Sequence, residues 1–155
     1  MGIEIERKFL VQNEQWRAGI EGELRIVQGY LANNYSTTVR VRIQGEQAYL
    51  TLKGPTRGIS RTEFEYSIPL SDAEFLLRDQ SIAPPIEKTR YLVRHDADLW
   101  ELDVFAGSNA GLVLAEIELE QPDQAFTPPE WLGAEVTADA RYYNINLARH
   151  PFLCW

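Results

Sequence analysis

The sequence predicts a mainly β (α+β) protein, in which a closed eight-stranded antiparallel β-barrel forms a tunnel with a few peripheral helices. Three observations predict this fold. Most of the chain alternates hydrophobic and polar residues with the period of two that is typical of strands. Helix signals are few and short. About eight strands in one small domain would leave exposed sheet edges, which closure into a barrel removes.

Length and composition fit one globular domain, expected over residues 1–155. The hydrophobic fraction is 45% and the charged fraction is 25%, both ordinary for a globular protein. No apolar run approaches the roughly 20 residues that span a bilayer, and the N-terminus has no signal-peptide pattern. The single cysteine, Cys154, suits a reducing compartment. We therefore expect a cytoplasmic protein without membrane contact.

Eight segments are predicted as strands, and each is bounded by turn or loop residues. Two of the links between them, Gln44-Gly45-Glu46 and Asp96-Ala97-Asp98, are predicted as hairpin turns. The predicted strands are residues 3–11, 24–32, 36–44, 47–53, 60–69, 86–95, 98–105 and 111–121.

Three segments carry helix signals. Ser71 and Glu74 form a capping-box pattern ahead of apolar residues, which predicts a helix near 71–80. The segment 127–130 has N-cap and early-proline signals for a short helical turn. Thr137 and Asp139 are candidate starts for a last helix, which would run through Tyr142, Tyr143 and Leu147 and end before Pro151.

The charged residues of the predicted strands share one face, because residues two apart in a strand point the same way. Each strand alone fits an ordinary antiparallel sheet with one wet face. Together, however, these rows would be partly desolvated inside a barrel and would need ion partners, metal or ligand. The rows are Glu4, Glu6 and Lys8; Arg40 and Arg42; Thr51 and Lys53; Arg61, Glu63 and Glu65; Lys88 and Arg90; Glu101 and Asp103; and Glu116, Glu118 and Glu120.

Two carboxylate pairs come from the first and last predicted strands: Glu4 with Glu6, and Glu116 with Glu118. If these strands meet in a closed barrel, the four carboxylates converge. Hard divalent cations such as Mg²⁺ or Mn²⁺ prefer carboxylate oxygens and retained water. Zinc is less favoured, because the two histidines and the lone cysteine have no zinc-ligand spacing. A salt-bridged structural network is the alternative reading of these carboxylates.

Seven cations on the same predicted face indicate an anionic ligand. Guanidinium groups bind phosphate oxygens in pairs, and lysines act as point charges. Seven cations exceed the need of a monophosphate and suit a linear triphosphate, which carries roughly four to five negative charges because a terminal phosphate loses its second proton near pH 6. A metal on the carboxylates would bridge the phosphates and orient the attacking water. The seven are Lys8, Arg40, Arg42, Lys53, Arg61, Lys88 and Arg90.

Other ligands and mechanisms are disfavoured. The net charge of −8 and the pI of about 4.8 argue against a general nucleic-acid binder. The chain has neither a G-x-x-x-x-G-K-[ST] nor a G-x-G-x-x-G phosphate-binding loop. It has no G-x-S-x-G elbow, and its thiol has no histidine nearby in sequence, which argues against covalent catalysis. A metal-activated water is the remaining simple mechanism.

At these residues the sequence resembles the triphosphate tunnel metalloenzyme superfamily, also called the CYTH domain family. Glu4-Ile5-Glu6-Arg7-Lys8 matches the ExExK signature of that family, and an ordered set of further motifs extends the resemblance over almost the whole chain. These motifs are Gln28-Gly29-Tyr30-Leu31, Val39-Arg40-Val41-Arg42, Leu50-Thr51-Leu52-Lys53-Gly54, Arg61-Thr62-Glu63-Phe64-Glu65, Lys88-Thr89-Arg90-Tyr91, Trp100-Glu101-Leu102-Asp103-Val104-Phe105, Ala115-Glu116-Ile117-Glu118-Leu119, and Asp139 with Tyr142 and Asn144.

The resemblance implies a tunnel that binds a triphosphate with one or two Mg²⁺ or Mn²⁺ ions. It implies a phosphate clamp made of the seven cations above. Tyr30, Tyr142 and Tyr143 would gate a tunnel mouth near a C-terminal helix or pack in the core. We expect catalytic roles for Glu4, Glu6, Lys8 and Lys88. The implied metal ligands are Glu4, Glu6, Glu116 and Glu118, with Glu63 and Asp103 as further acids for metal or water.

The expected reaction is hydrolysis of inorganic tripolyphosphate to pyrophosphate and phosphate. A class IV-type adenylate cyclase or a thiamine-triphosphatase is the enzymatic alternative. A polyphosphate or nucleotide sensor and a purely structural barrel are the non-enzymatic ones, because fold does not determine function. The expected partner is a small-molecule triphosphate, with no nucleic acid and no membrane, and a homodimer remains open.

Overall fold

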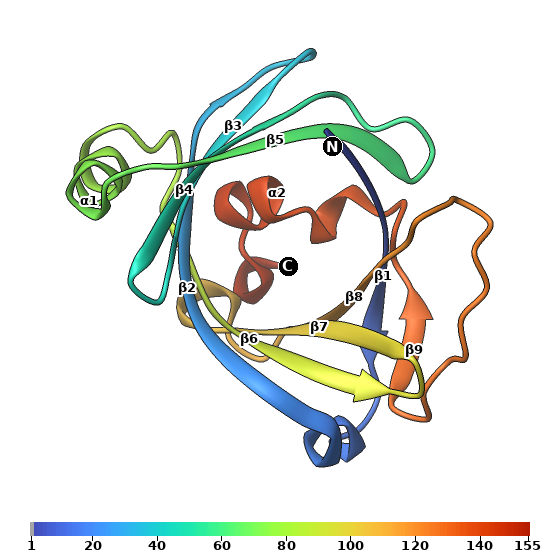
Figure 1. Ribbon diagram of the computed structural model, residues 1–155. Coiled ribbons are helices and arrows are strands. Elements are labelled where there is room, and N and C mark those ends of the chain that lie inside the picture. The colour runs from blue at the N-terminus through green and yellow to red at the C-terminus, as the bar shows by residue number, and fades with distance from the viewer. Residues whose placement is uncertain (1) are drawn as a thin grey trace.

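The computed structural model describes residues 2–155 and confirms the predicted fold class (Figure 1). The protein is mainly β, with a closed eight-stranded antiparallel barrel, one additional strand and two α-helices. No helix within the described residues is both long and apolar enough to cross a bilayer. The barrel strands are β1 (Ile3–Val11), β2 (Ile20–Asn33), β3 (Thr38–Gln44), β4 (Gln47–Lys53), β5 (Ser60–Ser67), β6 (Ile86–His95), β7 (Asp98–Phe105) and β8 (Val113–Glu118).

The barrel closes through β1, which pairs with different neighbours along its length. The order around the barrel is β5-β4-β3-β2-β6-β7-β8-β1, and the start of β1 pairs back with β5. Glu4 lies opposite Arg61 of β5, whereas Glu6 lies opposite Glu118 of β8 and Lys8 opposite Glu116. The first and last barrel strands therefore pair, which is the condition under which the sequence analysis expected the four glutamates to converge.

Several strand boundaries agree with the prediction and others move. The strands β1, β4, β6 and β7 have the predicted bounds, and the predicted hairpin turns contain Gly45 and Asp96 at positive φ. The strand β2 begins at Ile20 rather than at residue 24, and its first residues pair with β6 through a register shift between Ile20 and Gly22. The strands β3, β5 and β8 are shorter than predicted.

The helical turn predicted at 127–130 is wrong. That segment contains no helix and leads into β9 (Leu132–Glu135), a ninth strand that pairs with β1. The amide of Leu132 donates to the carbonyl of Pro129, so the chain turns directly into the strand. Four residues are too few for a recognisable alternation, and the proline signals indicated a helix instead.

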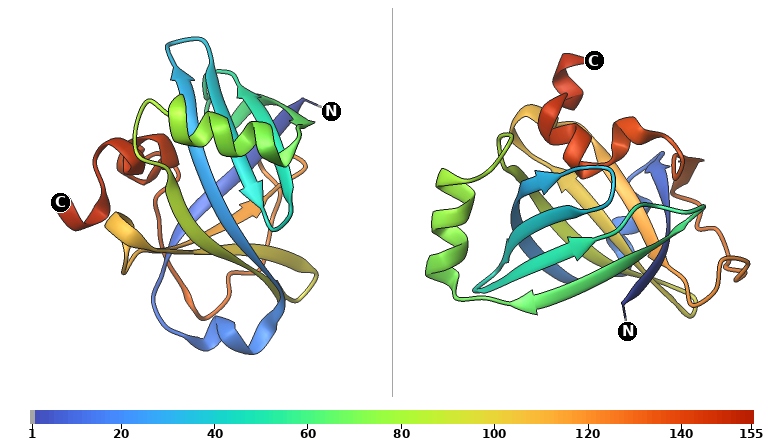
Figure 2. Two further views of the ribbon diagram at one scale, coloured as in Figure 1. Left: turned by 90° about the vertical axis from the view of Figure 1, so that its left-hand side faces the viewer. Right: turned by 90° about the horizontal axis from the view of Figure 1, so that it is seen from above.

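The helix α1 (Leu70–Asp79) lies where a helix was predicted, but its start differs. Pro69 occupies the N-cap position, and no side chain caps the helix, so the predicted capping box is not formed. The helix covers the outside of the barrel over β2, β3 and β4 (Figure 2). A Cβ at Gly29 of β2 would lie 2.6 Å from Oγ of Ser81 and 2.8 Å from a methyl carbon of Leu77, so these side chains would have to shift to admit a larger residue there.

The predicted last helix is split in two. A 3₁₀ helix (Ala140–Tyr142) follows Asp139, whose side chain accepts a hydrogen bond from the amide of Arg141. Tyr143 is extended, and α2 (Asn144–Arg149) begins after it. This C-terminal segment lies across one end of the barrel (Figures 1 and 2).

The inward faces of four strands change from charged to apolar at the end covered by α2. Leu10, Ile86, Phe105 and Leu114 continue the rows of Lys8, Lys88, Asp103 and Glu116. These apolar residues form a buried cluster with Tyr142, Leu147 and Ala148. The barrel is therefore closed by an apolar layer at this end, while the charged part of its lumen remains hollow.

Candidate active site

The lumen contains a cavity of about 490 Å³, within the usual range of small-molecule sites. Every predicted site residue except Asp103 lines it. The loops that follow β2 and β4 also contribute to the lining. The alternation of the strands therefore placed the charges on the inner face, as predicted. The predicted residues in the lining are Glu4, Glu6, Lys8, Arg40, Arg42, Lys53, Arg61, Glu63, Lys88, Arg90, Glu116 and Glu118.

Three carboxylates meet on one side of the lumen. Oxygens of Glu4, Glu6 and Glu118 all lie within 4.8 Å of one another. Burial raises the pKa of Glu4 to about 7, and burial with repulsion from Glu116 and Glu4 raises the pKa of Glu6 well above its usual value. These carboxyl groups therefore resist ionisation unless a cation lies beside them, and Lys53 is their single ion-pair partner among the described residues. Their donors are all hard oxygens, so the residues present fit a Mg²⁺ or Mn²⁺ ion.

Glu116 lies outside this group of three and opposite Lys8. Burial opposes ionisation of Glu116, but attraction by Lys8 and Arg90, together with a hydrogen bond from Glu6, lowers the pKa of Glu116 to about 2. Burial also opposes the charge of Lys8, yet Glu116 and Glu6 raise the pKa of Lys8. Of the four glutamates predicted as metal ligands, the structure therefore brings three together and gives the fourth a lysine partner.

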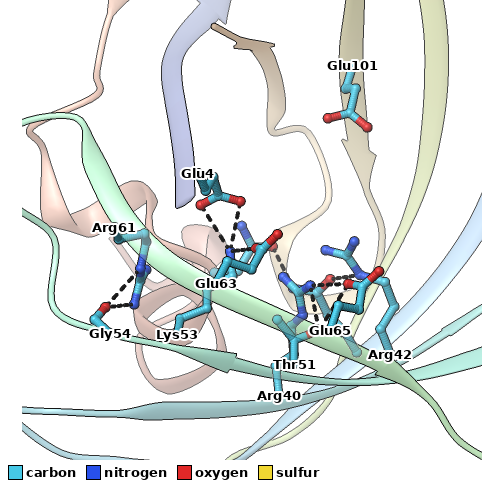
Figure 3. Close-up of polar contacts among 12 residues, drawn as sticks. Glu4, Arg40, Arg42, Thr51, Lys53, Gly54, Arg61, Glu63, Glu65 and Glu101 are labelled. Carbon is cyan, nitrogen blue, oxygen red and sulfur yellow. Dashed lines mark hydrogen bonds and ion pairs between the residues drawn. The ribbon is translucent and has the colours of Figure 1, made fainter. Parts of the chain in front are cut away.

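Two arginines of β3 extend into the lumen from the other side (Figure 3). Arg40 is only 5% exposed and donates to Oγ1 of Thr51 at 3.2 Å, while its Nε has no hydrogen-bond partner among the described residues. Arg42 donates from Nε to Oε1 of Gln28 at 2.9 Å. Burial, together with repulsion from Arg40 and Arg90, lowers the pKa of Arg42. This side of the lumen is crowded with positive charge.

Lys53 and Arg61 lie near the carboxylates but differ in their contacts. The Nζ of Lys53 is 3.3 Å from Oε1 of Glu4 and 3.0 Å from Oε2 of Glu63 (Figure 3). Arg61 instead donates twice to the carbonyl oxygen of Gly54, at 3.0 and 2.8 Å. Burial opposes ionisation of Glu63, but its contacts with Glu4 and Lys53 lower its pKa to about 2.

Asp103 is occupied by two cations and lies outside the cavity lining. It is fully buried, and it accepts from Nε and Nη2 of Arg90 at 2.8 and 2.9 Å. The Nζ of Lys88 lies 2.7 Å from Oδ2 of Asp103, the same oxygen that accepts from Nη2 of Arg90. Burial opposes the charge of Asp103, but Arg90 and Lys88 hold its pKa far below its usual range. The geometry makes Asp103 an anchor for the cations, with no oxygen directed at the cavity.

Two uncharged residues near the cations were missed by the sequence analysis as site residues. Oδ1 of Asn144 accepts from Nζ of Lys88 at 3.0 Å and from Nε2 of Gln28 at 3.2 Å. Gln28 is fully buried and bridges Asn144 to Arg42. Both residues lie in the family motifs, but a single neutral amide among alternating residues gave no other signal.

The three tyrosines considered as a gate are placed differently. Tyr142 packs in the apolar cluster under α2, and its carbonyl oxygen accepts from Nζ of Lys8 at 3.2 Å. Tyr30 and Tyr143 line the cavity. The ring of Tyr143 lies 5.8 Å from Nζ of Lys8, and the hydroxyl of Tyr30 accepts from Gln28.

Comparisons with known proteins agree with this geometry. Residues 2–150 match the CYTH domain. The chain is 44% identical over 152 residues to an inorganic triphosphatase of Acetivibrio thermocellus, covering 98% of this chain and 97% of that protein. It is also 44% identical over 152 residues to an inorganic triphosphatase of Nitrosomonas europaea, covering 94% and 96%. The crystal structure of the inorganic triphosphatase NE1496 superposes with a TM-score of 0.67 at 40% identity, covering 94% of this chain and 97% of that one. The chain belongs to the CYTH domain family, as its charged motifs predicted.

Proposed function

We propose that this chain is a metal-dependent triphosphatase that hydrolyses inorganic tripolyphosphate to pyrophosphate and phosphate in the lumen of its barrel. The observation that carries the proposal is the opposition of two sets of charge across one cavity. Three carboxyl groups with a single lysine contact lie on one side, and buried arginines line the other. The relatives named inorganic triphosphatase support the same reaction.

The cations would bind the phosphates. Arg40 and Arg42 are both buried and both line the cavity, so a phosphate in the lumen would lie within reach of their guanidinium groups. Guanidinium groups of Arg40 and Arg42 can each bind two phosphate oxygens. Cations spread along the lumen match an extended triphosphate better than a single phosphate. The remaining members of the proposed clamp are Lys8, Lys53, Arg61, Lys88 and Arg90.

Glu4, Glu6 and Glu118 would hold a Mg²⁺ or Mn²⁺ ion, with Glu63 and Glu116 close enough in the lining to assist. A bound divalent cation would neutralise phosphate charge and favour ionisation of water. We assign Asp103 to the support of Lys88 and Arg90 instead of to metal binding, because both of its oxygens accept from those cations.

The proposed reaction is the displacement of pyrophosphate by water. A water oxygen attacks a terminal phosphorus, the P–O bond to the adjacent phosphate breaks, and pyrophosphate leaves with that electron pair. The water proton passes to solvent or to a lumen carboxylate. Glu4 and Glu6 orient the reacting groups, and Lys8 and Lys88 neutralise charge on the phosphoryl oxygens, so catalysis depends on positioning and electrostatics.

A product assay tests the proposal. Purified protein receives tripolyphosphate, ATP or thiamine triphosphate with Mg²⁺ or Mn²⁺, and phosphate, pyrophosphate and cyclic AMP are measured. Fast phosphate release from tripolyphosphate is expected. Cyclic AMP with pyrophosphate from ATP would assign a cyclase, and tight tripolyphosphate binding without turnover would assign a sensor.

Glu118→Gln and Glu120→Gln provide a matched pair for that assay. Glu118 belongs to the carboxylate group, whereas Glu120 lies two residues further along, past the end of β8 and outside the cavity lining. Loss of turnover only in Glu118→Gln is expected. Equal activity of the two variants at limiting metal would contradict the proposed site.

We also propose that the protein acts in the cytoplasm, where triphosphate substrates are available. Cys154 is exposed and forms no disulfide, which agrees with a reducing compartment.

A further inference from the structure

We propose that Lys53 is a tethered counter-ion of the metal site. Its ammonium group neutralises Glu4 while no metal is bound, and a divalent cation displaces it toward the substrate phosphates. The inference rests on the proposed metal site and deepens it, because it predicts how metal and substrate depend on each other.

The contacts of Lys53 place its charge at the edge of the carboxylate group (Figure 3). Nζ lies 3.3 and 3.4 Å from the two oxygens of Glu4 and 3.0 Å from Oε2 of Glu63. Lys53 and Glu63 are cross-strand partners on β4 and β5, whereas Glu4 is on β1. The lysine therefore reaches past its own neighbour to a carboxylate that also belongs to the metal group.

No other ion pair reaches this group in residues 2–155. Glu4 pairs with Lys53, while Glu6 and Glu118 have no salt bridge there. A cation coordinated by the three carboxylates would use the same oxygens of Glu4 that face the ammonium. It would also repel the lysine, since two positive charges a few ångströms apart in a partly buried site interact strongly. Metal and Lys53 should therefore compete for Glu4.

Once displaced by metal, Lys53 could bind the phosphates of the substrate. Its flexible four-carbon stem carries a compact charge that can move between partners without the fixed geometry of a guanidinium. Lys53 lines the same cavity as Arg40, so its ammonium can turn from Glu4 toward bound phosphate. Metal binding would thus add a cation to the phosphate clamp. By linkage, the triphosphate would in turn tighten the metal.

Arg61 offers a matched control within the same wall. It lies directly opposite Glu4 in the pairing of β1 with β5, so it is also a cation beside the carboxylates. Its guanidinium, however, donates to the carbonyl oxygen of Gly54 and contacts no carboxylate of the group. Replacing Arg61 removes one positive charge from the lumen without removing a competitor for Glu4.

The test measures metal binding in the absence of substrate. Metal-free wild type, Lys53→Met, Lys53→Arg and Arg61→Met are titrated with Mn²⁺, and free Mn²⁺ is followed by its EPR signal. Lys53→Met is expected to bind Mn²⁺ roughly five- to tenfold more tightly than Arg61→Met, at the lower end of typical coupling between sites. Lys53→Arg keeps the charge and should remain close to wild type. Thermal unfolding checks that all variants fold.

Two results would overturn the inference. Equal tightening in Lys53→Met and Arg61→Met would mean that lumen charge alone acts on the metal. Unchanged or weaker Mn²⁺ binding in Lys53→Met would mean that the lysine supports the site instead of competing. A wild type that binds Mn²⁺ no better than Glu118→Gln, with Lys53→Met equally weak, would refute the metal site itself and with it the proposed function.

Discussion

Lys88 donates a hydrogen bond from Nζ to Oδ1 of Asn144 at 3.0 Å, although the two residues are 56 positions apart. The bond connects the cation side of the lumen to the first residue of α2, the helix that covers one end of the barrel. The same oxygen accepts from Gln28, which also holds Arg42. The C-terminal segment therefore orients two cations of the proposed clamp as well as closing the barrel.

Asn144→Ala should weaken catalysis without unfolding the protein. Lys88 would keep Asp103 but lose the acceptor that directs its ammonium, and a hydrogen bond to a charged group contributes about 1.5–3 kcal/mol. We expect kcat/KM for tripolyphosphate to fall roughly ten- to a hundredfold on that basis. Steady-state kinetics with a thermal melt would measure this.

Asn146→Ala is the control for that change. Asn146 lies two residues further along in α2 and donates to the carbonyl oxygen of Ala140 instead of contacting a cation. Its replacement should leave kcat/KM near wild type. A similar loss in both variants would mean that Asn144 acts through the stability of α2 alone.

Tripolyphosphate binding should take up a proton at pH 8 through Lys88. Burial, with repulsion from Arg90 and Arg42, lowers the pKa of Lys88 to about 7 against the attraction of Asp103, so most of this lysine is neutral at pH 8. Negative phosphates favour the charged form and raise that pKa, so protons bind with the ligand. At pH 6 the lysine is already charged, and the uptake through it should vanish.

Calorimetry of metal-free protein in buffers of different ionisation enthalpy measures that uptake. Lys88→Met is the comparison, because other lumen groups can also exchange protons. The uptake at pH 8 should be smaller in the variant by up to one proton. An identical uptake in wild type and Lys88→Met would rule out this lysine as the group that titrates.

The sequence predicted which residues face the lumen, but it did not predict how far along the barrel each one lies or which partner it meets. Alternation alone assigned Glu4, Glu6 and Glu118 to the inner face, and the closure of the barrel then brought their carboxylates together. Asp103 and Glu116 are on inner rows too, but position along the barrel decides their partners. That position depends on the register between strands, which pairs Lys8 with Glu116 and is not encoded in the pattern of either strand.

Features without charge or periodicity were harder to predict. Asn144 and Gln28 acquire their roles only through contacts between distant segments. The short strand β9 has no alternation, and it exists because its backbone finds an open edge of β1. The split of the last helix at Tyr143 likewise follows from docking: Tyr142 on one side and Leu147 on the other both enter the apolar cluster.

Asp103→Asn should destabilise the fold strongly at neutral pH. Asp103 is fully buried between Arg90 and Lys88, and removing one partner of a buried ion network costs about 3–5 kcal/mol. Because its pKa is far below the usual value when folded, the stability it contributes is present above the unfolded pKa near 4. It is lost as the pH falls further, through the folded pKa.

Denaturant unfolding of wild type and Asp103→Asn at pH 7 and at pH 3 measures this difference, which should narrow at the lower pH. Glu101→Gln is the control, since Glu101 lies on the same inner row but keeps only one contact, with Arg90 at 3.0 Å. Mn²⁺ affinity should be retained in any Asp103→Asn protein that remains folded. A specific loss of Mn²⁺ binding in a folded Asp103→Asn protein would mean that Asp103 is a metal ligand.

Arg40→Met should weaken tripolyphosphate binding more than binding of inorganic phosphate. A charge-assisted bond from the guanidinium of Arg40, which lines the cavity, would contribute about 1.5–3 kcal/mol, and its loss corresponds to roughly ten- to a hundredfold weaker binding. A single phosphate can move to the other cations, whereas an extended triphosphate uses the whole row at once. The comparison of KM for tripolyphosphate with the inhibition constant of phosphate separates the effects on the two ligands.

Arg25→Met is the control, because Arg25 is exposed on the outer face of β2 and pairs with Glu87 at 3.1 Å. Equal losses for both ligands in Arg40→Met would argue for a monophosphate site and against a clamp that spans a chain of phosphates.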